Sequence, residues 1–305
     1  MRDILEYRTL SKLRSTYCDG LLKVIGEDGR IRSTLNQTET RTGRISSTEP
    51  NLQNIPVRSP LGREMRKFFV ARDGYVLVDA DYSQIELRVL AHISGDRNMI
   101  KAFNDNTDIH TVTASEVFDM PPQLVTPIMR SRAKAVNFGI VYGIGAFSLA
   151  KDIGVSRSEA DEYIKGYLRH YSGVDKYMHD VVEKAKKDGY AETMFARRRY
   201  LPELTASNAN TRAFGERVAR NMPIQGTAAD IIKIAMIRVY ERLERENLAA
   251  KLIMQVHDEL IVEAPENEKE RVSALLKEEM ENAVKLSVAL TADVHSGRTW
   301  YDAKG

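Results

Sequence analysis

The stretch VLVDADYSQIELR at residues 76–88 decides the fold class of this chain. Residues 75–81 alternate enough to predict a strand, and the apolar positions of residues 84–94 recur at the spacing of a helix. Asp81 therefore lies where a strand ends and a helix follows. A carboxylate at the exit of a buried run is typical of an ordinary polar turn, and it is also typical of a metal-binding edge of a sheet.

A second stretch, LIMQVHDELIVE at residues 252–263, has the same character. Its two apolar runs bracket His257, Asp258 and Glu259, which predicts a hairpin with acidic residues at its tip. Neighbouring strands of one sheet lie ~4.8 Å apart, so the two strand ends could hold two carboxylates within the ~3.5–4 Å spacing of a two-metal phosphoryl-transfer site. Hard oxygen ligands of this kind suit Mg²⁺. The sequence has no Cys/His cluster, GxxxxGKS/T loop or GxGxxG loop, so zinc, P-loop and Rossmann chemistry are unsupported.

The stretch MRSRAKAVNFGIVYGIG at residues 129–145 places Arg130, Lys134, Phe138 and Tyr142 at four-residue steps. Each step advances by about 40° around a helix, so the four side chains form a slanted stripe on one face. Two cations followed by two aromatic rings suit a polyphosphate at one end and a sugar and base at the other. A surface helix with snorkelling cations and core aromatics explains the same pattern. The glycines that follow predict a hinge.

The other segments predict a mixture of helices, strands and loops. We expect a helix over 5–17, a hairpin of 21–25 with 31–35, an ordered loop over 36–60, a mostly helical lobe over 97–206, a helix over 225–247, an acidic helix over 268–285 and a final strand in LTADVHSGRTW.

The composition excludes several classes of protein. The 305 residues include 45 basic and 43 acidic side chains and are 43% hydrophobic, which is typical of a globular protein and excludes a polybasic tail or a disordered chain. Cys18 is the only cysteine, so no intramolecular disulfide forms and the cytoplasm is the expected compartment. The N-terminus lacks a secretory core, and no apolar run approaches the about 18 residues that span a membrane.

Charge is unevenly distributed along the chain. Seven basic and two acidic residues lie within 41–72, four basic and no acidic residues lie within 120–151, and a third basic stretch covers 197–220. A solvated surface explains scattered basic patches. Patches interleaved with Tyr, Phe, Asn and Gln also suit a polyanion such as nucleic acid.

Taken together, these segments resemble the polymerase region of the bacterial family A DNA polymerases. DYSQIELR (81–88) resembles the family's motif A, RxxxKxxxFxxxY (130–142) its motif B and QVHDE (255–259) its motif C. TGRISSTEPNLQNIP (42–56) and PIQGTAADI (223–231) are similar to two further family segments, and all five occur in the family's order.

The resemblance implies an α+β fold with a right-hand architecture. Residues 31–88 and 209–305 would form an antiparallel-sheet palm, residues 89–208 the helical fingers, and residues 1–30 the base of the thumb. The rest of the thumb and the two nuclease domains of the family are expected to lie outside this chain, so proofreading and flap removal are not implied.

The resemblance also assigns the metal site. Asp81 and Asp258 would be ligands of two Mg²⁺ ions, with the Tyr82 carbonyl as a backbone ligand and Glu259 as a supporting acid. One ion would lower the pKa of the primer 3′-hydroxyl and the other would neutralise the leaving pyrophosphate.

The residues implied for the incoming deoxynucleoside triphosphate come mainly from motif B. Arg130 and Lys134 would bind the triphosphate with help from His110, Phe138 would pack on the deoxyribose, and Tyr142 would lie near the template base at the hinge of fingers closure. Glu86 would close the pocket beside the sugar C2′. We expect Glu86 to share a helix face with Tyr82, four residues earlier.

Arg44, Asn221, Gln225 and His257 resemble the family's residues around the primer end and the minor groove. Every Watson–Crick pair presents acceptors in that groove, so such donors test pair shape without reading sequence. Without the motif, a helix cap and a surface amide would be the favoured explanation of Asn221 and Gln225.

These observations lead to the hypothesis that the chain is a DNA-directed DNA polymerase core, which adds deoxynucleotides from dNTPs to a primer 3′ end. Primer-template DNA and dNTPs would be its partners, and a monomer in the bacterial nucleoid is expected. Two alternatives remain: a two-metal nuclease, which would leave the motif B stripe without a purpose, and a thumb-less DNA-binding fragment with little synthesis.

Overall fold

The computed structural model describes residues 2–56 and 60–304 and divides into two compact units. Unit 1 comprises Met1–Tyr82, Ile232–Ala283 and Thr291–Gly305, and unit 2 comprises Ser83–Ile231 and Val284–Leu290. Met1 and Gly305, the outer bounds of two predicted domains, lie outside the described residues. The predicted division into thumb base, palm and fingers stays a prediction.

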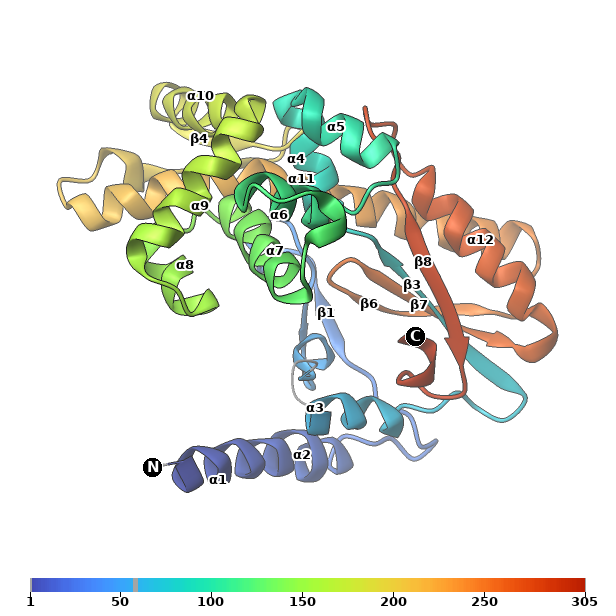
Figure 1. The fold of residues 1–305 in the computed structure, drawn as a ribbon. Helices are drawn as coiled ribbons and strands as arrows, with labels where there is room; N and C mark the ends of the chain where they lie inside the picture. The colour runs from blue at the N-terminus through green and yellow to red at the C-terminus, as the bar shows by residue number, and fades with distance from the viewer. Residues whose placement is uncertain (1, 57–59, 305) are drawn as a thin grey trace. The chain divides into compact units, whose positions relative to one another are not determined.

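Unit 1 contains a four-stranded antiparallel sheet with the strand order β6-β7-β3-β8 (Figure 1). Its strands are β3 (Tyr75–Tyr82), β6 (Lys251–Val256), β7 (Glu259–Pro265) and β8 (Ala292–Gly297). The predicted strand before Asp81, the predicted acidic hairpin and the predicted final strand are confirmed. Because β3 pairs directly with β7, two segments far apart in the sequence become neighbours.

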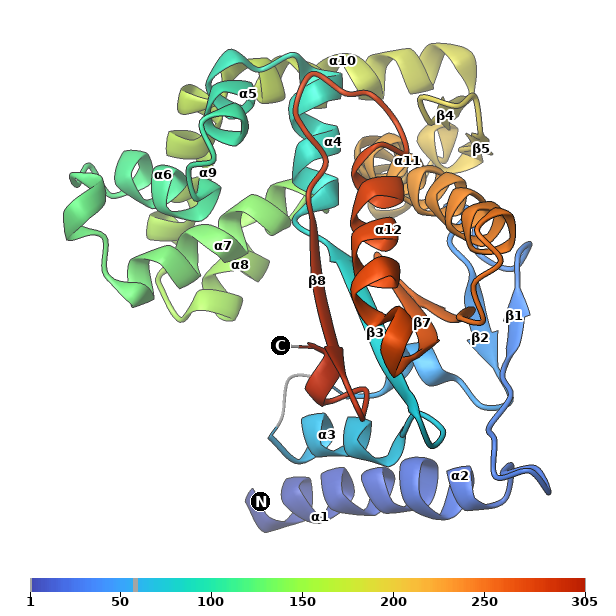
Figure 2. The ribbon, with the colours of Figure 1, turned by 90° about the vertical axis from the view of Figure 1, so that its right-hand side faces the viewer.

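The two faces of this sheet have different partners. Tyr82 lies on the face that α12 (Lys269–Glu281) covers in Figure 2, and its buried hydroxyl donates a hydrogen bond to the carbonyl oxygen of Met280 (2.6 Å). Successive side chains of a strand point to opposite faces, so Asp79 and Asp81 lie on the other face. The predicted acidic helix is confirmed, although it ends at Glu281 and not at residue 285, and it covers one side of the sheet.

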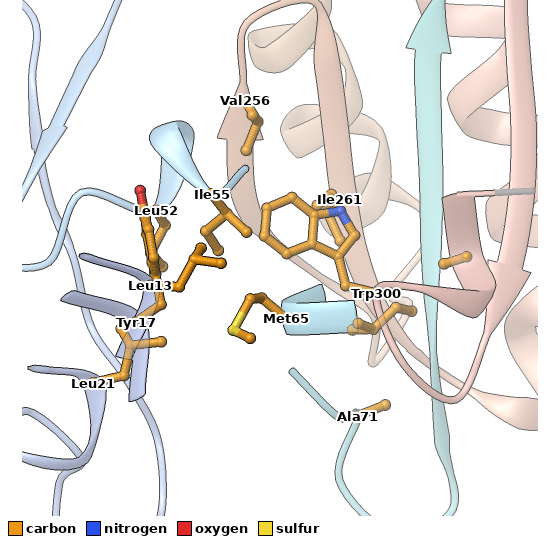
Figure 3. Close-up of a cluster of buried hydrophobic side chains, with 12 residues drawn as sticks. Leu13, Tyr17, Leu21, Leu52, Ile55, Met65, Ala71, Val256, Ile261 and Trp300 are labelled. Carbon is orange, nitrogen blue, oxygen red and sulfur yellow. The ribbon is translucent and has the colours of Figure 1, made fainter. Parts of the chain in front are cut away.

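The face opposite α12 packs on a cluster of buried apolar side chains, which Figure 3 shows. Its members come from the N-terminal helices, the sheet and the C-terminal turn: Leu13, Tyr17, Leu21, Leu52, Ile55, Met65, Ala71, Leu77, Val256, Ile261, Trp300 and Ala303. Fully burying one large apolar side chain is worth about 1.5–3 kcal/mol. The cluster thus holds both ends of the described chain against the sheet.

Unit 1 contains further, mostly short elements. They are α1 (Arg2–Leu13), a π-helical turn (Arg14–Cys18), α2 (Asp19–Leu22), β1 (Thr34–Asn36), β2 (Ser46–Thr48), α3 (Pro60–Glu64) and 3-10 turns at Leu52–Asn54, Met65–Phe68, Glu266–Glu268 and Asp302–Lys304.

The predicted hairpin of residues 21–25 with 31–35 is wrong in extent. Helix α2 continues to Leu22, and only Ile25 and Ile31 form an antiparallel bridge. Leu22, Val24 and Ile25 are exposed, so no buried face holds a longer ladder in register. The strand β1 pairs instead with β2, which lies within the predicted loop over 36–60.

Unit 2 is mainly helical (Figure 1), as predicted for residues 97–206. Its helices are α4 (Ile85–Ser94), α5 (Arg97–Asn104), α6 (Ile109–Val117), α7 (Pro127–Val141), α8 (Ala146–Ile153), α9 (Arg157–His170) and α10 (Ser172–Asp188), with 3-10 turns at Pro122–Leu124 and Pro202–Thr205. The small hairpin of β4 (Tyr190–Glu192) and β5 (Arg198–Tyr200) was not predicted. Three-residue strands are too short to give a periodic signal.

Helix α11 (Ala209–Arg245) is longer than the predicted helix over 225–247. It contains Pro223, and proline removes a backbone donor from a helix interior, so a helix is normally expected to end before it. Across residues 2–56 and 60–304, no helix has both the length and the hydropathy of a membrane span.

Candidate active site

Antiparallel pairing brings both predicted carboxylate positions to one end of the sheet of unit 1. Asp81 in β3 is paired with Glu259 in β7, and the Tyr82 N–H donates a hydrogen bond to the carbonyl oxygen of Asp258 (3.1 Å). Directly paired residues point to the same face, so the Asp81 and Glu259 side chains are neighbours. The expectation that the two strand ends belong to one sheet is confirmed.

The turn between β6 and β7 holds His257 and Asp258 at its tip. His257 has a left-handed backbone (φ 53°), which few residues other than glycine adopt, and the Gln255 amide donates to its carbonyl oxygen. The Asp258 Oδ1 atom lies 3.9 Å from Nη2 of Arg44. Burial and the Arg44 charge lower the pKa of His257, so its imidazole is neutral at pH 7.

Lys304 is a resident cation in this cluster of acids. Its Nζ lies 2.8 Å from Oδ2 of Asp81 and 2.6 Å from Oε2 of Glu259, and the indole N–H of Trp300 donates to the other Glu259 oxygen (2.8 Å). Burial alone would lower the pKa of Lys304, but the nearby negative charges, that of Glu259 first and that of Asp81 as well, raise it. Lys304 is therefore charged at pH 7.

Asp79 and Glu259 form a buried pair of carboxyl groups. Burial raises the pKa of Asp79, and the nearby Glu259 charge adds to this effect. Burial opposes ionisation of Glu259 as well, but the contact with Asp79 and the charge of Lys304 keep the Glu259 pKa below its usual value. Glu259 is thus the ionised partner and Asp79 the neutral one at pH 7.

The acidic groups line an open cavity of about 820 Å³ within unit 1, whose walls include Asp81, Asp258, Glu259 and Lys304. Mg²⁺ takes oxygen ligands and usually keeps several waters beside one or two protein carboxylates and substrate phosphates. Asp81 and Asp258 offer two partly exposed carboxylates, so the donor set fits such an ion. Among residues 2–56 and 60–304, no three His, Cys, Asp or Glu side chains are grouped to enclose a metal ion by themselves.

In unit 2, the predicted stripe lies on the outer face of α7. Arg130 and Lys134 are exposed and Phe138 is half-buried, whereas Ala133 and Val136 are buried on the inner face. Tyr142 is the C-terminal cap residue and is 46% exposed. The alternative in which both aromatics are core residues is therefore wrong.

Arg130 already has a carboxylate partner within unit 2. Its Nε donates to Oδ2 of Asp108 (2.5 Å) and its Nη2 to Oδ1 (3.3 Å). Burial would raise the pKa of Asp108, but the bonds from Arg130 and Thr111 lower it to about 2. A bound polyphosphate would share Arg130 with Asp108 or displace it.

His110 lies in α6 beside Phe138, with the ring centroids 5.9 Å apart. Its Nδ1 is 3.1 Å from Nδ2 of Asn137, whose amide also donates to the carbonyl oxygen of Ala133 (3.1 Å). Burial lowers the pKa of His110 to about 4. His110 therefore brings a hydrogen-bonding imidazole, and no charge, at pH 7.

The expected sharing of a helix face by Tyr82 and Glu86 is wrong. Tyr82 is the last residue of β3, and α4 begins only at Ile85 after Gln84, which has a left-handed backbone (φ 55°). The i to i+4 rule applies only inside a helix. Glu86 instead accepts a hydrogen bond from the Tyr142 hydroxyl (2.9 Å), so a motif A acid and a motif B aromatic are in contact within unit 2.

The predicted DNA-contacting residues belong to different units. Arg44 and His257 are in unit 1, and Asn221 and Gln225 are in unit 2. The latter two lie one turn apart in α11 and are half-buried beside a run of buried positions, and the Asn221 amide approaches the Val141 carbonyl oxygen at 3.5 Å. Asn221 is inside α11, so it is not a helix cap. Their roles at the minor groove stay a prediction.

Sequence reasoning missed Asp79, Asp108, Asn137 and Lys304. The DAD triplet gave a usable signal for Asp79, because residues two apart in a strand share a face. Asp108 and Asn137 contact predicted residues from positions that carry no periodic pattern of their own. Lys304 reaches the site through the packing of the C-terminal turn, for which the sequence holds no motif.

The chain is similar in sequence to known proteins over nearly its whole length. The chain matches the sequence profile of DNA polymerase family A over residues 1–302. It is 53% identical to DNA polymerase I of Caldicellulosiruptor bescii over 302 residues, covering 99% of this chain and 36% of that protein. It is 54% identical to DNA polymerase I of Geobacillus stearothermophilus over 303 residues, covering 99% of this chain and 35% of that protein. The chain thus spans about a third of the length of these relatives.

A solved structure extends the similarity to the fold. It is described as the POL domain of Pol1 from M. smegmatis in complex with DNA primer-template and dNTP. The two are 46% identical with a TM-score of 0.96, and the match covers 100% of this chain and 54% of that one. The α+β fold expected from the sequence is confirmed by this match.

Proposed function

Because this chain belongs to DNA polymerase family A, we propose that it is the catalytic core of a DNA-directed DNA polymerase. It would add deoxynucleoside monophosphates from dNTPs to a primer 3′ end, with primer-template DNA as its other partner. The observation that carries this proposal is the pairing of β3 with β7, because it brings the acids of motif A and motif C to the wall of one cavity. Residues 31–88 and 209–305 would be its palm and residues 89–208 its fingers.

Asp81 and Asp258 would hold two Mg²⁺ ions, with the Tyr82 carbonyl as a further oxygen ligand and Glu259 in support. Ions bound there would activate the primer 3′-hydroxyl and stabilise the charge that develops on the transferred phosphoryl group. The chain's own contribution is to place two partly exposed carboxylates on the cavity wall, Asp81 from β3 and Asp258 from the turn between β6 and β7. Glu259 and Asp79 stay behind them, bound to Trp300 and Lys304.

In unit 2, the outer face of α7 would bind the incoming nucleotide. Arg130 and Lys134 supply exposed positive charges for the triphosphate, and His110 supplies a neutral hydrogen-bonding group beside Phe138. Phe138 would pack on the deoxyribose, and Tyr142 would act near the template base while it holds Glu86. Arg44, His257, Asn221 and Gln225 would contact the primer end and the minor groove.

Primer extension separates this function from its alternatives. A 5′-labelled primer on a longer template, incubated with Mg²⁺ and four dNTPs, should lengthen. Shortening of the primer would favour a two-metal nuclease, and an unchanged primer that still binds the protein would favour a fragment with little synthesis. Lys134→Ala, which removes an exposed cation from α7, should raise the dNTP KM in the first case and leave nuclease activity unchanged in the second.

We expect the 305-residue chain by itself to bind primer-template weakly, with a shallow salt dependence. Of the four assigned DNA contacts, Arg44 alone carries a permanent charge, and His257 is neutral at pH 7. The slope of log K against log salt is about −0.9 per neutralised phosphate, so one to three phosphates give about −1 to −3. Fluorescence anisotropy between low and physiological salt measures this slope.

Weak binding should also make synthesis distributive. With a heparin trap added at the start, one binding event should yield only short extensions. A slope steeper than about −5, which corresponds to more than five phosphates, would contradict this picture of the DNA contact.

A monomeric state and action in the nucleoid belong to the same proposal. Sedimentation of the chain with and without DNA tests the monomeric state.

A further inference from the structure

Lys304 has no part in the polymerase chemistry assigned above, yet its ammonium group lies among the acids of the catalytic cavity. It contacts Asp81 Oδ2 and Glu259 Oε2 directly and lies 3.8 Å from Oδ1 of Asp79. One cation thus bridges β3 and β7 at the point where the proposed metal ligand Asp81 projects. A group in this place affects how strongly any other cation binds there.

The position of Lys304 is built into the fold. Gly297 at the end of β8 has no side chain, and a Cβ there would come within 2.4 Å of Cβ and 2.7 Å of the carbonyl carbon of Asp302. Trp300 and Ala303 are fully buried on either side of that contact. Thr299 Oγ1 donates to the Asp302 carboxylate (2.7 Å). The turn, whose last residue is Lys304, is therefore packed directly on the sheet.

The two acids that Lys304 bridges are held differently. Glu259 is 6% exposed, and both of its oxygens have donors, Trp300 Nε1 and Lys304 Nζ. The Asp81 side chain is 42% exposed to the cavity, and Lys304 binds its Oδ2. A cation that enters from the cavity can therefore replace the lysine at Asp81 more easily than at Glu259.

We propose that Lys304 is an internal counterion that competes with the catalytic divalent cation for Asp81 and keeps Glu259 as its permanent partner. Lys304 would then set the cation affinity of the site, and Glu259 would act by positioning Lys304. The inference rests on the proposed function, because it takes Asp81 as a metal ligand. It predicts that the site binds cations more tightly once the lysine charge is removed.

The direct test is Mn²⁺ binding to the 305-residue chain, measured by electron paramagnetic resonance without DNA or nucleotide. Lys304→Met should bind Mn²⁺ about tenfold to a hundredfold more tightly than the parent, because an ammonium about 4 Å away no longer repels the ion. Lys277→Met, which removes an exposed charge from α12, should bind as the parent does. Unchanged or weaker binding by Lys304→Met would overturn the proposal.

Thermal melting with and without Mg²⁺ gives a second readout. The Mg²⁺-dependent part of the change in melting temperature distinguishes a counterion from a lysine that only packs. With EDTA, Lys304→Met should melt below the parent, because Asp81 and Glu259 lose their cation. Added Mg²⁺ should raise its melting temperature more than that of the parent. An equal deficit with and without Mg²⁺ would mean that Lys304 only packs. If Lys304→Met does not fold, Lys304→Ala and Lys304→Gln serve the same test, with Lys304→Arg expected to retain the parental affinity.

Asp81→Ala distinguishes failure of this inference from failure of the proposed function. Asp81→Ala should abolish Mn²⁺ binding at this site, both as a single substitution and combined with Lys304→Met. If Asp81→Ala binds Mn²⁺ as the parent does, the assignment of Asp81 as a metal ligand fails and the inference with it. If Asp81→Ala loses binding but Lys304→Met gains none, only the role of Lys304 is refuted.

Discussion

Asp81→Ala and Asp258→Ala should each lower primer extension by about a thousandfold or more while the protein remains folded. Each substitution removes one of two carboxylates that a divalent ion would use, and loss of about 4 kcal/mol of transition-state stabilisation corresponds to that factor. Neither side chain is a packing group, since both are partly exposed to the cavity. Single-turnover extension of a primer by one dNTP measures the effect directly.

Circular dichroism, thermal melting and primer-template binding are the controls for the aspartate variants. Glu266→Ala removes the same charge from an exposed position of unit 1 and should extend primers like the parent. Glu259→Ala should cost less activity than the aspartate variants but more stability, because it leaves the buried Trp300 N–H without its acceptor. Near-parental extension by either aspartate variant would refute the two-metal assignment.

Short-range patterns were sufficient to predict the elements that carry most of the proposed site. Alternation predicted β3 and the β6-β7 hairpin because each has a buried face, and helical spacing predicted the stripe on α7. Propensity rules failed where tertiary packing overrides them. Pro223 lies inside α11, although proline normally ends a helix, and the exposed residues after α2 form one bridge instead of a hairpin.

Contacts that depend on three-dimensional closure could not be predicted. Lys304 reaches Asp81 over 223 positions of sequence, and it does so only because Gly297 allows the C-terminal turn to pack on β8. The bond between Arg130 and Asp108 likewise joins α7 to the N-cap residue of α6 through side chains that follow no common period. The sequence therefore indicates which groups are present, but the electrostatic partners of those groups emerge only from packing.

The contact between Glu86 and Tyr142 leads to a prediction about sugar selection. Glu86→Ala should raise ribonucleotide insertion relative to deoxynucleotide insertion by roughly tenfold to a hundredfold, the range for a group of about methylene size in a pocket. Phe138→Tyr, which adds a hydroxyl to the stripe residue expected to pack on the deoxyribose, should instead raise dideoxynucleotide insertion. Single-nucleotide kcat/KM for the three sugar types measures both ratios, and neither variant should have the effect of the other.

The hydrogen bond itself makes this prediction sharper, because Tyr142 would act on the sugar through Glu86. Tyr142→Phe removes a donor 2.9 Å from the Glu86 carboxylate and should relax ribonucleotide exclusion partly, by less than Glu86→Ala does. In the Glu86→Ala background, Tyr142→Phe should add no further change to the ribonucleotide ratio, because the side chain that it positions is gone. If the two effects multiplied instead, Tyr142 would act on the sugar independently, and the bond would not be the means by which Glu86 is held beside the C2′ position.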